Sequence, residues 1–398
     1  MNPAREVGAA LLTGGFDKHY TFGLAMALAA EDVSLEIIGG DTVDCPAFHN
    51  PPKLAFLNLR GSKEENTGLM AKVSRVLLYY ARLVRYAACA RPKVFHILWN
   101  NKFEFFDRTL LMLYYKLMGK KICFTAHNIN EGKRDFKDSV LNRLTLRIQY
   151  RLADRVFVHT DKMKQELLEE FGVRDRAVCV IPYGINNSVP HTDLTSREAK
   201  QRLGVSADQK TILFFGAIRP SKGLDYLVDA FLRLAAVHPE YRLIIAGETR
   251  KETKDYFDKV RQTIDGHPNR SQVIQRIEYI PDEETEVYFK AADVIAMPYT
   301  LIFQSGVLFL AHSFGLPVVA SDVGSFREDI TEGRTGFLCR PCDAADLSRA
   351  IEQYFASDLF QTLDWRRHEI QARANARHSW STVGKMTREV YAGLLGEN

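Results

Sequence analysis

The sequence predicts an α/β protein built from two tandem doubly wound, Rossmann-like domains that face each other across a cleft. Short apolar runs rich in β-branched and aromatic residues alternate with longer stretches of helical period, which is typical of βαβ units and parallel sheets. This rhythm is interrupted at residues 183–197 by prolines, a glycine and a cluster of Asn, Ser, Thr and Asp without a period. A length of 398 residues also fits two domains of about 150 residues or more.

The first half of the chain contains the elements of the first predicted domain, residues 1–185. Its apolar runs predict strands at about 7–13, 33–39, 93–98, 121–126, 155–160 and 176–181. The stretches of helical period between them predict helices at 68–90, 105–118, 138–153 and 161–171.

The second half repeats the rhythm and gives a second predicted domain, residues 186–377. Its strands are predicted at about 211–217, 241–247, 293–298, 317–321 and 336–340. Residues 378–398 have the pattern of an amphipathic helix that can pack on either domain, and the N-terminal domain is the favoured partner. In such folds ligands bind at the carboxyl ends of the strands, so the loops that follow the strands are the first places to look for a site.

The composition excludes several classes of protein. Hydrophobic residues make up 46% and charged residues 26%, which is the balance of a globular protein rather than a disordered or fibrous one. No apolar run approaches the ~18 residues of a spanning helix and no signal peptide is evident, so we expect a cytoplasmic protein. Six cysteines are too sparse for a disulfide framework, and we assign no chemistry to the C-x-x-C pair Cys339 and Cys342.

The net charge of +4 is unevenly distributed, because residues 51–150 hold 19 Lys and Arg against 7 Asp and Glu. Such a segment can attract anionic lipid, nucleic acid or polyanionic substrates. Its most basic part, residues 71–93, carries Lys72, Arg75, Arg82 and Arg85 among many apolar residues. As a helix it can lie on an anionic membrane surface, or it can be a core helix whose cations extend from its edges. We expect no nucleic-acid partner, because no recognisable module accompanies the charge.

Two glycines, Gly14 and Gly15, stand between the first strand and the helix that follows it. They would let the backbone approach an anion at the N-terminus of that helix, although a tight turn explains them equally well. A histidine, His127, follows the predicted strand 121–126 and is placed to hydrogen-bond a substrate hydroxyl, although a satisfied loop histidine is the commoner case.

A pair of cations, Arg219 and Lys222, precedes the first helix of the second domain and is flanked by glycines. Two fixed cations and backbone N–H donors in one loop suit a diphosphate, whereas the alternative is a solvated loop. No Asp-x-Asp motif was found in the sequence, so we expect neither an essential metal ion nor another cofactor.

Several ordered motifs resemble those of glycosyltransferase family 4, also called glycosyltransferase group 1. They are FFGAIRPSKGLDYLVDAF, LIIAGE, EETEVYFKAADVIAMPY, QSGVLFLAHSFGLPVVASDVGSFREDI and EGRTGFLCRPCDAADL. The early Gly-Gly pair, the loop histidine and the segment VIPYGI also stand where that family has them. The resemblance implies the two-domain GT-B architecture and a hexosyltransferase that moves a sugar from a nucleoside-diphosphate-sugar donor, generally with retention, to a glycan or lipid-linked acceptor in surface polysaccharide or glycoconjugate biosynthesis.

The resemblance also assigns roles to residues. It implies that Arg219 and Lys222 hold the donor diphosphate, that His127 contacts the transferred sugar and that the nucleotide base lies against residues 276–281. Further donor-binding positions are implied at Gly14, Gly15, Gly216, Gly247, Tyr279, Ile280, Gln304, Ser305 and Gly306.

One departure from the family pattern concerns two glutamates, the second of which contacts the ribose hydroxyls. Ile302 and Leu310 occupy those positions here, and neither side chain can accept a hydrogen bond. A similar subset has Gln-Ser-Gly in this stretch, which predicts an altered donor site. The alternatives are a sugar-nucleotide-binding protein without turnover and a nucleotide-sugar epimerase of the same fold.

Overall fold

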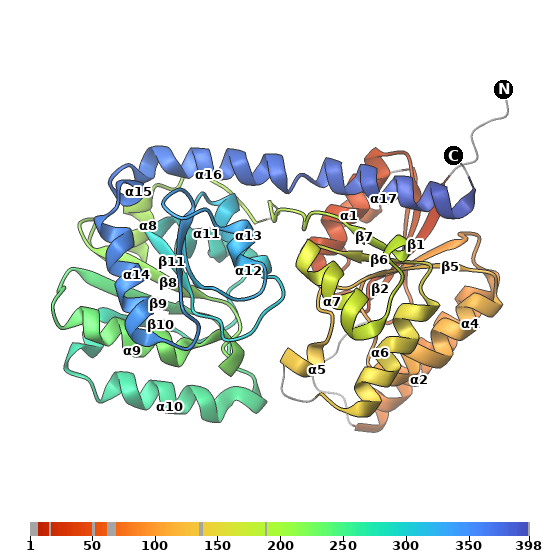
Figure 1. Ribbon diagram of the computed structural model, residues 1–398, viewed down its shortest axis with the longest axis horizontal. Coiled ribbons are helices and arrows are strands. Elements are labelled where there is room, and N and C mark those ends of the chain that lie inside the picture. The colour runs from red at the N-terminus through yellow and green to blue at the C-terminus, as the bar shows by residue number, and fades with distance from the viewer. Residues whose placement is uncertain are drawn as a thin grey trace. The chain divides into compact units, whose positions relative to one another are not determined.

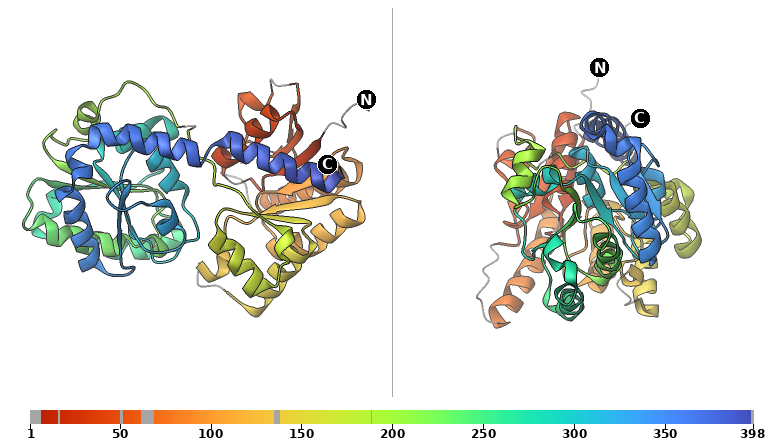
Figure 2. Two further views of the ribbon diagram at one scale, coloured as in Figure 1. Left: turned by 45° about the horizontal axis from the view of Figure 1, so that its top comes forward. Right: turned by 90° about the vertical axis from the view of Figure 1, so that its left-hand side faces the viewer.

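The computed structural model describes residues 7–15, 17–49, 52–61, 69–134, 138–187 and 189–396. The chain forms two compact units, of which unit 1 comprises residues 1–184 and 378–398 and unit 2 comprises residues 185–377. Each unit is built around its own parallel sheet with helices on both faces (Figures 1 and 2). The predicted fold class, two Rossmann-like α/β domains, is therefore confirmed.

The sheet of unit 1 has seven strands in the order β3-β2-β1-β4-β5-β6-β7, and every pairing is parallel. The strands are β1 (Gly8–Leu12), β2 (Ser34–Gly39), β3 (Leu54–Asn58), β4 (Val94–Ile97), β5 (Lys121–Thr125), β6 (Arg155–Val158) and β7 (Val178–Val180). Leu12 pairs with Ile38 on one side and Ile97 on the other, so the carboxyl ends of the central strands lie level at one edge.

The helices of unit 1 cover both faces of this sheet. One face carries α1 and α17, which lie side by side in Figure 1. The helices are α1 (Lys18–Ala30), α2 (Leu69–Cys89), α3 (Glu104–Phe106), the π-turn η2 (Asp107–Leu111), α4 (Met112–Leu117), α5 (Glu131–Arg134), α6 (Val140–Leu152), α7 (Asp161–Phe171) and α17 (Trp380–Leu395), with short 3₁₀ turns η1 (Pro46–Phe48) and η3 (Asp175–Ala177).

The last helix, α17, is fitted closely into unit 1 by its first residue. The indole of Trp380 fills the space over two glycines, because a Cβ on Gly23 would lie 2.1 Å from it and a Cβ on Gly184 would lie 2.3 Å from it. Further along α17, Tyr391 is fully buried, and its hydroxyl lies 2.6 Å from Nδ1 of His96 in β4. The helix therefore completes the core of unit 1.

Replacing Tyr391 with phenylalanine is expected to destabilise unit 1 by about 1–3 kcal/mol. The two ring nitrogens of His96 contact the Tyr391 hydroxyl at 2.6 Å and Thr125 Oγ1 at 2.7 Å, and the substitution leaves one of them buried without a partner. Urea unfolding of the full chain measures the change, with Tyr279→Phe at an exposed position as the control. An unchanged unfolding midpoint would show that the contact adds nothing to stability.

The sheet of unit 2 has six parallel strands in the order β10-β9-β8-β11-β12-β13. They are β8 (Lys210–Phe215), β9 (Tyr241–Ala246), β10 (Val273–Arg276), β11 (Val294–Met297), β12 (Val318–Ser321) and β13 (Gly336–Cys339). The helices are α8 (Ser196–Arg202), α9 (Leu224–Ala235), α10 (Lys254–Asp265), α11 (Asp282–Ala291), α12 (Gly306–Ser313), α13 (Phe326–Asp329), α14 (Ala344–Ala356), α15 (Asp358–Gln361) and α16 (Leu363–Arg377), with 3₁₀ turns η4 (Pro220–Lys222), η5 (Lys251–Thr253) and η6 (Pro268–Gln272).

Three elements differ from the sequence-based expectation. The strands β3 and β10 were not predicted, and both are edge strands, since β3 pairs only with β2 and β10 only with β9 among the described residues. Each of the two has a single buried residue, Leu54 in β3 and Val273 in β10, so the apolar signal is weak. The predicted helix 105–118 is instead a succession of α3, η2 and α4, in which a π-turn interrupts the α-helical period.

Candidate functional site

The loop between β8 and α9 brings the predicted cations of unit 2 to the carboxyl edge of its sheet. Gly216 and Gly223, which flank the loop, have φ angles of 98° and 63°, a left-handed conformation that favours glycine. A Cβ on Gly223 would lie 2.0 Å from the carbonyl oxygen of Pro298, so this turn fits only without a side chain. The glycines thus fix the path of the loop that carries Arg219 and Lys222.

Backbone hydrogen bonds align this loop with the ends of the neighbouring strands. The Gly216 N–H donates to the Ala246 carbonyl at 2.9 Å, and the Gly247 N–H donates to the Arg276 carbonyl at 3.0 Å. A Cβ on Gly247 would lie 2.0 Å from the Gly216 carbonyl oxygen, which explains the glycine there. The loops after β8, β9 and β10 therefore form one row at the carboxyl edge of the sheet. The loop after β10 comprises residues 276–281, in which Tyr279 is exposed and Ile280 is buried.

Lys222 is held in this row with its side chain 6% exposed. Its Nζ lies 3.4 Å from the Phe215 carbonyl oxygen and 5.2 Å from the centre of the Tyr299 ring. Within the described part of the chain, that long bond is the only hydrogen bond of the ammonium group. A buried ammonium with spare N–H donors is costly without an anion, so the position favours an anionic ligand. Arg219 lies three residues earlier, in extended conformation at the start of η4.

The segment before α12 faces the same loop. The Thr300 N–H donates to the Ser221 carbonyl at 3.0 Å, which ties the chain after β11 to η4. Ser305 is buried with its hydroxyl 3.5 Å from that of Tyr299, and Gly306 begins α12. The structure therefore brings the predicted positions 304–306 to the edge that also holds Lys222.

Gln304 carries a buried acceptor atom close to the positions of the missing carboxylates. Its side chain is bonded to the buried carboxyl of Asp329, whose pKa is raised to about 6, mainly by burial. Because a carboxylate accepts, the Gln304 amide nitrogen is the donor, and its Oε1 is buried without a partner among the described residues. Ile302 and Leu310 are 8% and 7% exposed, so both are apolar wall residues.

In unit 1 the Gly14–Gly15 turn makes room for an arginine that was not predicted. A Cβ on Gly15 would lie 1.7 Å from Nη1 of Arg60, and this guanidinium donates to the Gly14 carbonyl. It also lies over the Tyr79 ring, 5.0 Å from the ring centre. The Gly15 N–H donates to Thr13 Oγ1 at 3.2 Å, so this amide is already paired. The group that the turn could present to an anion is therefore the guanidinium of Arg60 rather than this amide. Arg60 follows strand β3. Because that strand was not predicted, the sequence did not indicate that Arg60 lies at the carboxyl edge of the sheet.

His127 is enclosed by aromatic rings after β5. Its ring stacks on Trp99 with 4.2 Å between ring centres and an interplanar angle of 9°, and it meets the Tyr20 ring edge to face with 4.6 Å between ring centres. Burial, reinforced by His159 and His96, holds the pKa of His127 well below its usual range. The imidazole is therefore neutral near neutral pH.

A neighbouring histidine, His159, fixes the tautomer of His127. Nδ1 of His159 lies 3.3 Å from the Ile181 carbonyl oxygen, which can only accept, so Nδ1 carries the proton. Burial lowers the pKa of His159 to about 4, so its Nε2 is an acceptor, and it receives the Nδ1–H of His127 at 3.2 Å. The Nε2 of His127 therefore keeps its lone pair, and it is buried without a partner among the described residues. His159 was not singled out from the sequence.

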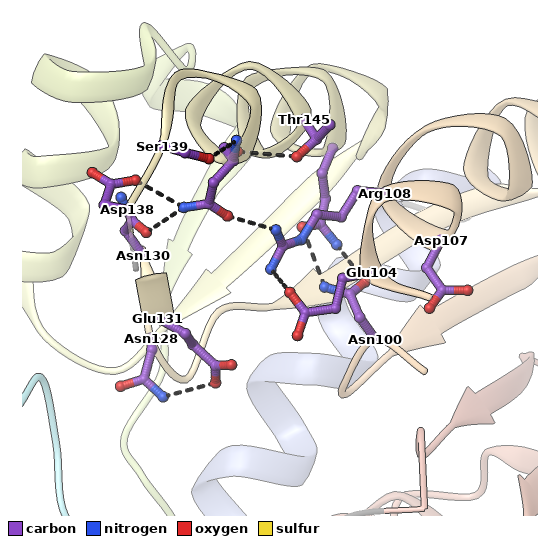
Figure 3. Close-up of polar contacts among 12 residues, drawn as sticks. Asn100, Glu104, Asp107, Arg108, Asn128, Asn130, Glu131, Asp138, Ser139 and Thr145 are labelled. Carbon is purple, nitrogen blue, oxygen red and sulfur yellow. Dashed lines mark hydrogen bonds and ion pairs between the residues drawn. The ribbon is translucent and has the colours of Figure 1, made fainter. Parts of the chain in front are cut away.

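A second polar cluster lies at the same edge of unit 1, where α3, η2 and α6 meet the loop after β5 (Figure 3). Arg108, 3% exposed, donates to Asn142 Oδ1 at 2.8 Å and to Glu104. The Asn142 amide in turn donates to Asn130 at 2.8 Å and Asp138 at 2.9 Å. This network links the loop after β5 to η2 and α6. The half-buried Asn100, Asn128 and Glu131 beside it offer hydrogen-bonding groups at the edge (Figure 3).

The described residues contain no group of three or more His, Cys, Asp or Glu side chains that could hold a metal ion. Within those residues, no helix is both long enough and apolar enough to cross a membrane. The requirement for a metal stays a prediction from the sequence.

Two Rossmann-like units with a cation loop, glycine turns and a histidine at the carboxyl edges of their sheets define the GT-B class of glycosyltransferases. Sequence profiles agree: "Glycosyl transferases group 1" matches residues 195–376, and "Glycosyltransferase Family 4" matches residues 18–189. The chain belongs to this family of glycosyltransferases, as the motifs predicted.

Curated relatives include two D-inositol 3-phosphate glycosyltransferases. That of Corynebacterium aurimucosum is 25% identical over 254 residues, 61% of this chain and 58% of the relative. That of Mycobacterium tuberculosis is 27% identical over 252 residues, 62% of this chain and 50% of the relative. The chain thus spans about half the length of the curated relatives it matches.

Solved structures share the fold over nearly the whole chain. Sucrose-phosphate synthase from Thermosynechococcus elongatus has a TM-score of 0.78 at 18% identity and covers 99% of this chain and 100% of its own. The Anabaena protein HepE in complex with UDP-glucose has a TM-score of 0.74 at 18% identity and covers 97% and 99%.

Proposed function

We propose that this protein transfers a sugar from a nucleoside-diphosphate-sugar donor to a hydroxyl of a glycan or lipid-linked acceptor. The observation that carries the proposal is the buried Lys222, which shares the glycine-flanked loop after β8 with Arg219 and lies where that loop meets the chain after β11. A diphosphate supplies the charge that this position lacks. The HepE complex with UDP-glucose, which has the same fold, supports a nucleotide-sugar donor. Surface polysaccharide or glycoconjugate biosynthesis is the setting we infer.

The reaction we propose breaks the bond between the anomeric carbon and the diphosphate oxygen while the acceptor oxygen bonds to the same carbon. With retention, the acceptor attacks on the face that the diphosphate leaves, and its proton passes to an oxygen of the departing diphosphate. Lys222 and Arg219 stabilise the negative charge that develops on that group, as fixed cations in a dry site do most effectively. Because the two cations offset this charge, we propose that no metal ion is essential.

Two acceptor atoms orient the donor in this proposal. Oε1 of Gln304, buried and held by Asp329, accepts a hydrogen bond from a donor hydroxyl in place of the absent glutamates. Nε2 of His127, unprotonated because of His159, accepts from a hydroxyl of the transferred sugar. Both atoms favour a ligand with hydroxyl donors over a ligand without them, because a buried acceptor left unpaired costs about 1–3 kcal/mol.

Thermal unfolding with a panel of UDP-, GDP-, dTDP- and ADP-sugars tests the proposal. At a donor concentration near 100 times its dissociation constant, stabilisation of about 2.7 kcal/mol is expected for the native donor. The Arg219→Ala/Lys222→Ala double variant should lose it, whereas Lys251→Ala/Lys259→Ala, which removes two exposed cations of unit 2, should keep it. Stabilisation that survives in the double variant would contradict the assigned diphosphate site.

A binding protein without turnover is a second candidate, favoured by the apolar Ile302 and Leu310. Release of nucleoside diphosphate separates the two, because a binder is stabilised by the donor but releases none. A nucleotide-sugar epimerase would release none either, and would instead change the sugar of the donor.

Location follows from the acceptor that we propose. A lipid-linked acceptor lies on a membrane, and the basic segment 71–93 would hold the protein there as a peripheral, cytoplasmic enzyme at the inner face of the cell membrane.

A further inference from the structure

Exposed hydrophobic side chains are concentrated on one side of unit 1. Of the 17 large hydrophobic residues that are exposed in the described part of the chain, 14 lie between Met70 and Leu144. They occupy the outer surfaces of α2, of α3–η2–α4 and of α6, which together we call the docking face. Its apolar residues include Val73 and Leu77 of α2, Leu110 and Leu113 of η2 and α4, and Leu141 and Leu144 of α6. Apolar patches of this extent mark interaction sites.

The three segments of the docking face are neighbours. Tyr80 of α2 stacks on Phe103, just before α3, with 5.4 Å between ring centres, and its hydroxyl lies 3.2 Å from Asp107 of η2. Arg108 of η2 donates to Asn142 of α6 at 2.8 Å. Figure 1 shows α2, α4 and α6 on the side of the sheet away from α1 and α17. Since each segment follows a parallel strand, each begins at the carboxyl edge, beside the polar cluster of Figure 3.

Two of the three segments of the docking face, α2 and α6, are also strongly cationic. Helix α2 has four Lys or Arg residues and α6 has three, and neither helix contains an acidic residue. Beside α2, a cavity of about 520 Å³ is lined by Arg82, Arg85 and Arg91 with a single carboxyl, Glu36. The Tyr86 hydroxyl donates to that carboxyl at 2.5 Å. Apolar side chains surrounded by cations fit a surface that is apolar within and anionic at its boundary.

We propose that the docking face seats this protein on an anionic lipid bilayer, with its leucines and valine in the acyl boundary and its cations among lipid phosphates. If α2 were only a core helix, the burial of Tyr79, Leu83 and Ala87 would be explained. The exposure of Leu77 and its exposed neighbours would not be. A second copy of the chain would place seven cations of these two helices opposite seven, so like-charge repulsion disfavours a dimer through this face. The inference rests on the proposed function only for the acceptor, which would reach the carboxyl edge from the membrane.

Co-sedimentation of the full chain with vesicles tests the docking face. Vesicles of phosphatidylcholine alone are compared with vesicles that also contain phosphatidylglycerol, at low and high salt. The variant Leu77→Gln/Leu113→Gln/Leu144→Gln changes residues that are 58%, 45% and 52% exposed, and Val237→Gln in unit 2, 68% exposed, is the matched control. We expect the native chain and the control to bind the anionic vesicles, and the triple variant to bind about tenfold or more weakly.

Equal binding by the triple variant and the native chain would overturn the proposal. So would equal binding to both kinds of vesicle, or a dimer in solution that the triple variant separates. Donor-induced stabilisation without lipid is measured on the same variants, and it should be unchanged. That readout reports on the site in unit 2, so failure of the docking face and failure of the donor assignment give different results.

Discussion

Replacing Lys222 with glutamine is expected to lower the rate of sugar transfer by about 10²- to 10³-fold. Lys222 is 6% exposed and lies at the point where the loops after β8 and β11 meet, so its charge acts in a low dielectric. Glutamine keeps most of the side-chain volume but removes the charge that offsets the departing diphosphate. Nucleoside diphosphate release under donor saturation measures the effect on kcat.

The control is Lys259→Gln, which removes an exposed cation from α10 in the same unit. Its rate should equal that of the native chain. If Lys222→Gln also turned over at the native rate, the leaving group would be stabilised elsewhere and Lys222 would be a structural residue. A loss of donor affinity without a loss of kcat would mean that Lys222 binds ground state and transition state equally.

Mild acid is expected to destabilise unit 1 through its buried histidines. Burial lowers the pKa of His96 to about 3 and that of His159 to about 4, below the usual value near 6.5. In the unfolded chain these rings take up protons as the pH falls through about 6.5, whereas the folded rings stay neutral. Their contribution to stability is therefore present above pH ~6.5 and is lost as the pH falls, by about 2 kcal/mol for each ring at pH ~5.

The carboxyl of Asp107 opposes this trend, because burial raises its pKa to about 6 and protonation then favours the folded state. The variant His159→Phe isolates the contribution of this histidine to the pH dependence of the free energy of unfolding. Its free energy of unfolding should fall less between pH ~7 and pH ~5 than that of the native chain, by about 2 kcal/mol, in urea titrations at the two pH values. The same fall in both proteins would show that His159 titrates normally in the folded state.

Much of the fold could be predicted because the central strands carry their own signal. Strand β8 and helix α9 can be predicted from the spacing of their apolar residues and from the glycines that flank the loop between them. That loop, which carries Arg219 and Lys222, is one short segment of the sequence. Strands β3 and β10 each bury a single residue, so neither shows a clear apolar run or alternation in the sequence.

The parts of the site that escaped prediction depend on contacts between distant residues. Arg60 reaches Gly14 across 46 positions, and Tyr391 reaches His96 across 295. His159 gains its role only because β5 and β6 are paired, which places it beside His127. No local pattern marks such residues, whereas Arg219 and Lys222 lie three positions apart in one loop.

The position of α17 has a consequence for biogenesis. Residues 378–396 lie across α1 in unit 1, yet they leave the ribosome only after all of unit 2 has been made. During synthesis, the apolar face of α1 and the ring of His96 therefore lack their partners Trp380 and Tyr391. Unit 2 is contiguous and can fold as it emerges, so the nascent chain acquires its later unit before its earlier one is complete. A chaperone that covers exposed apolar surface would act on unit 1 during that interval.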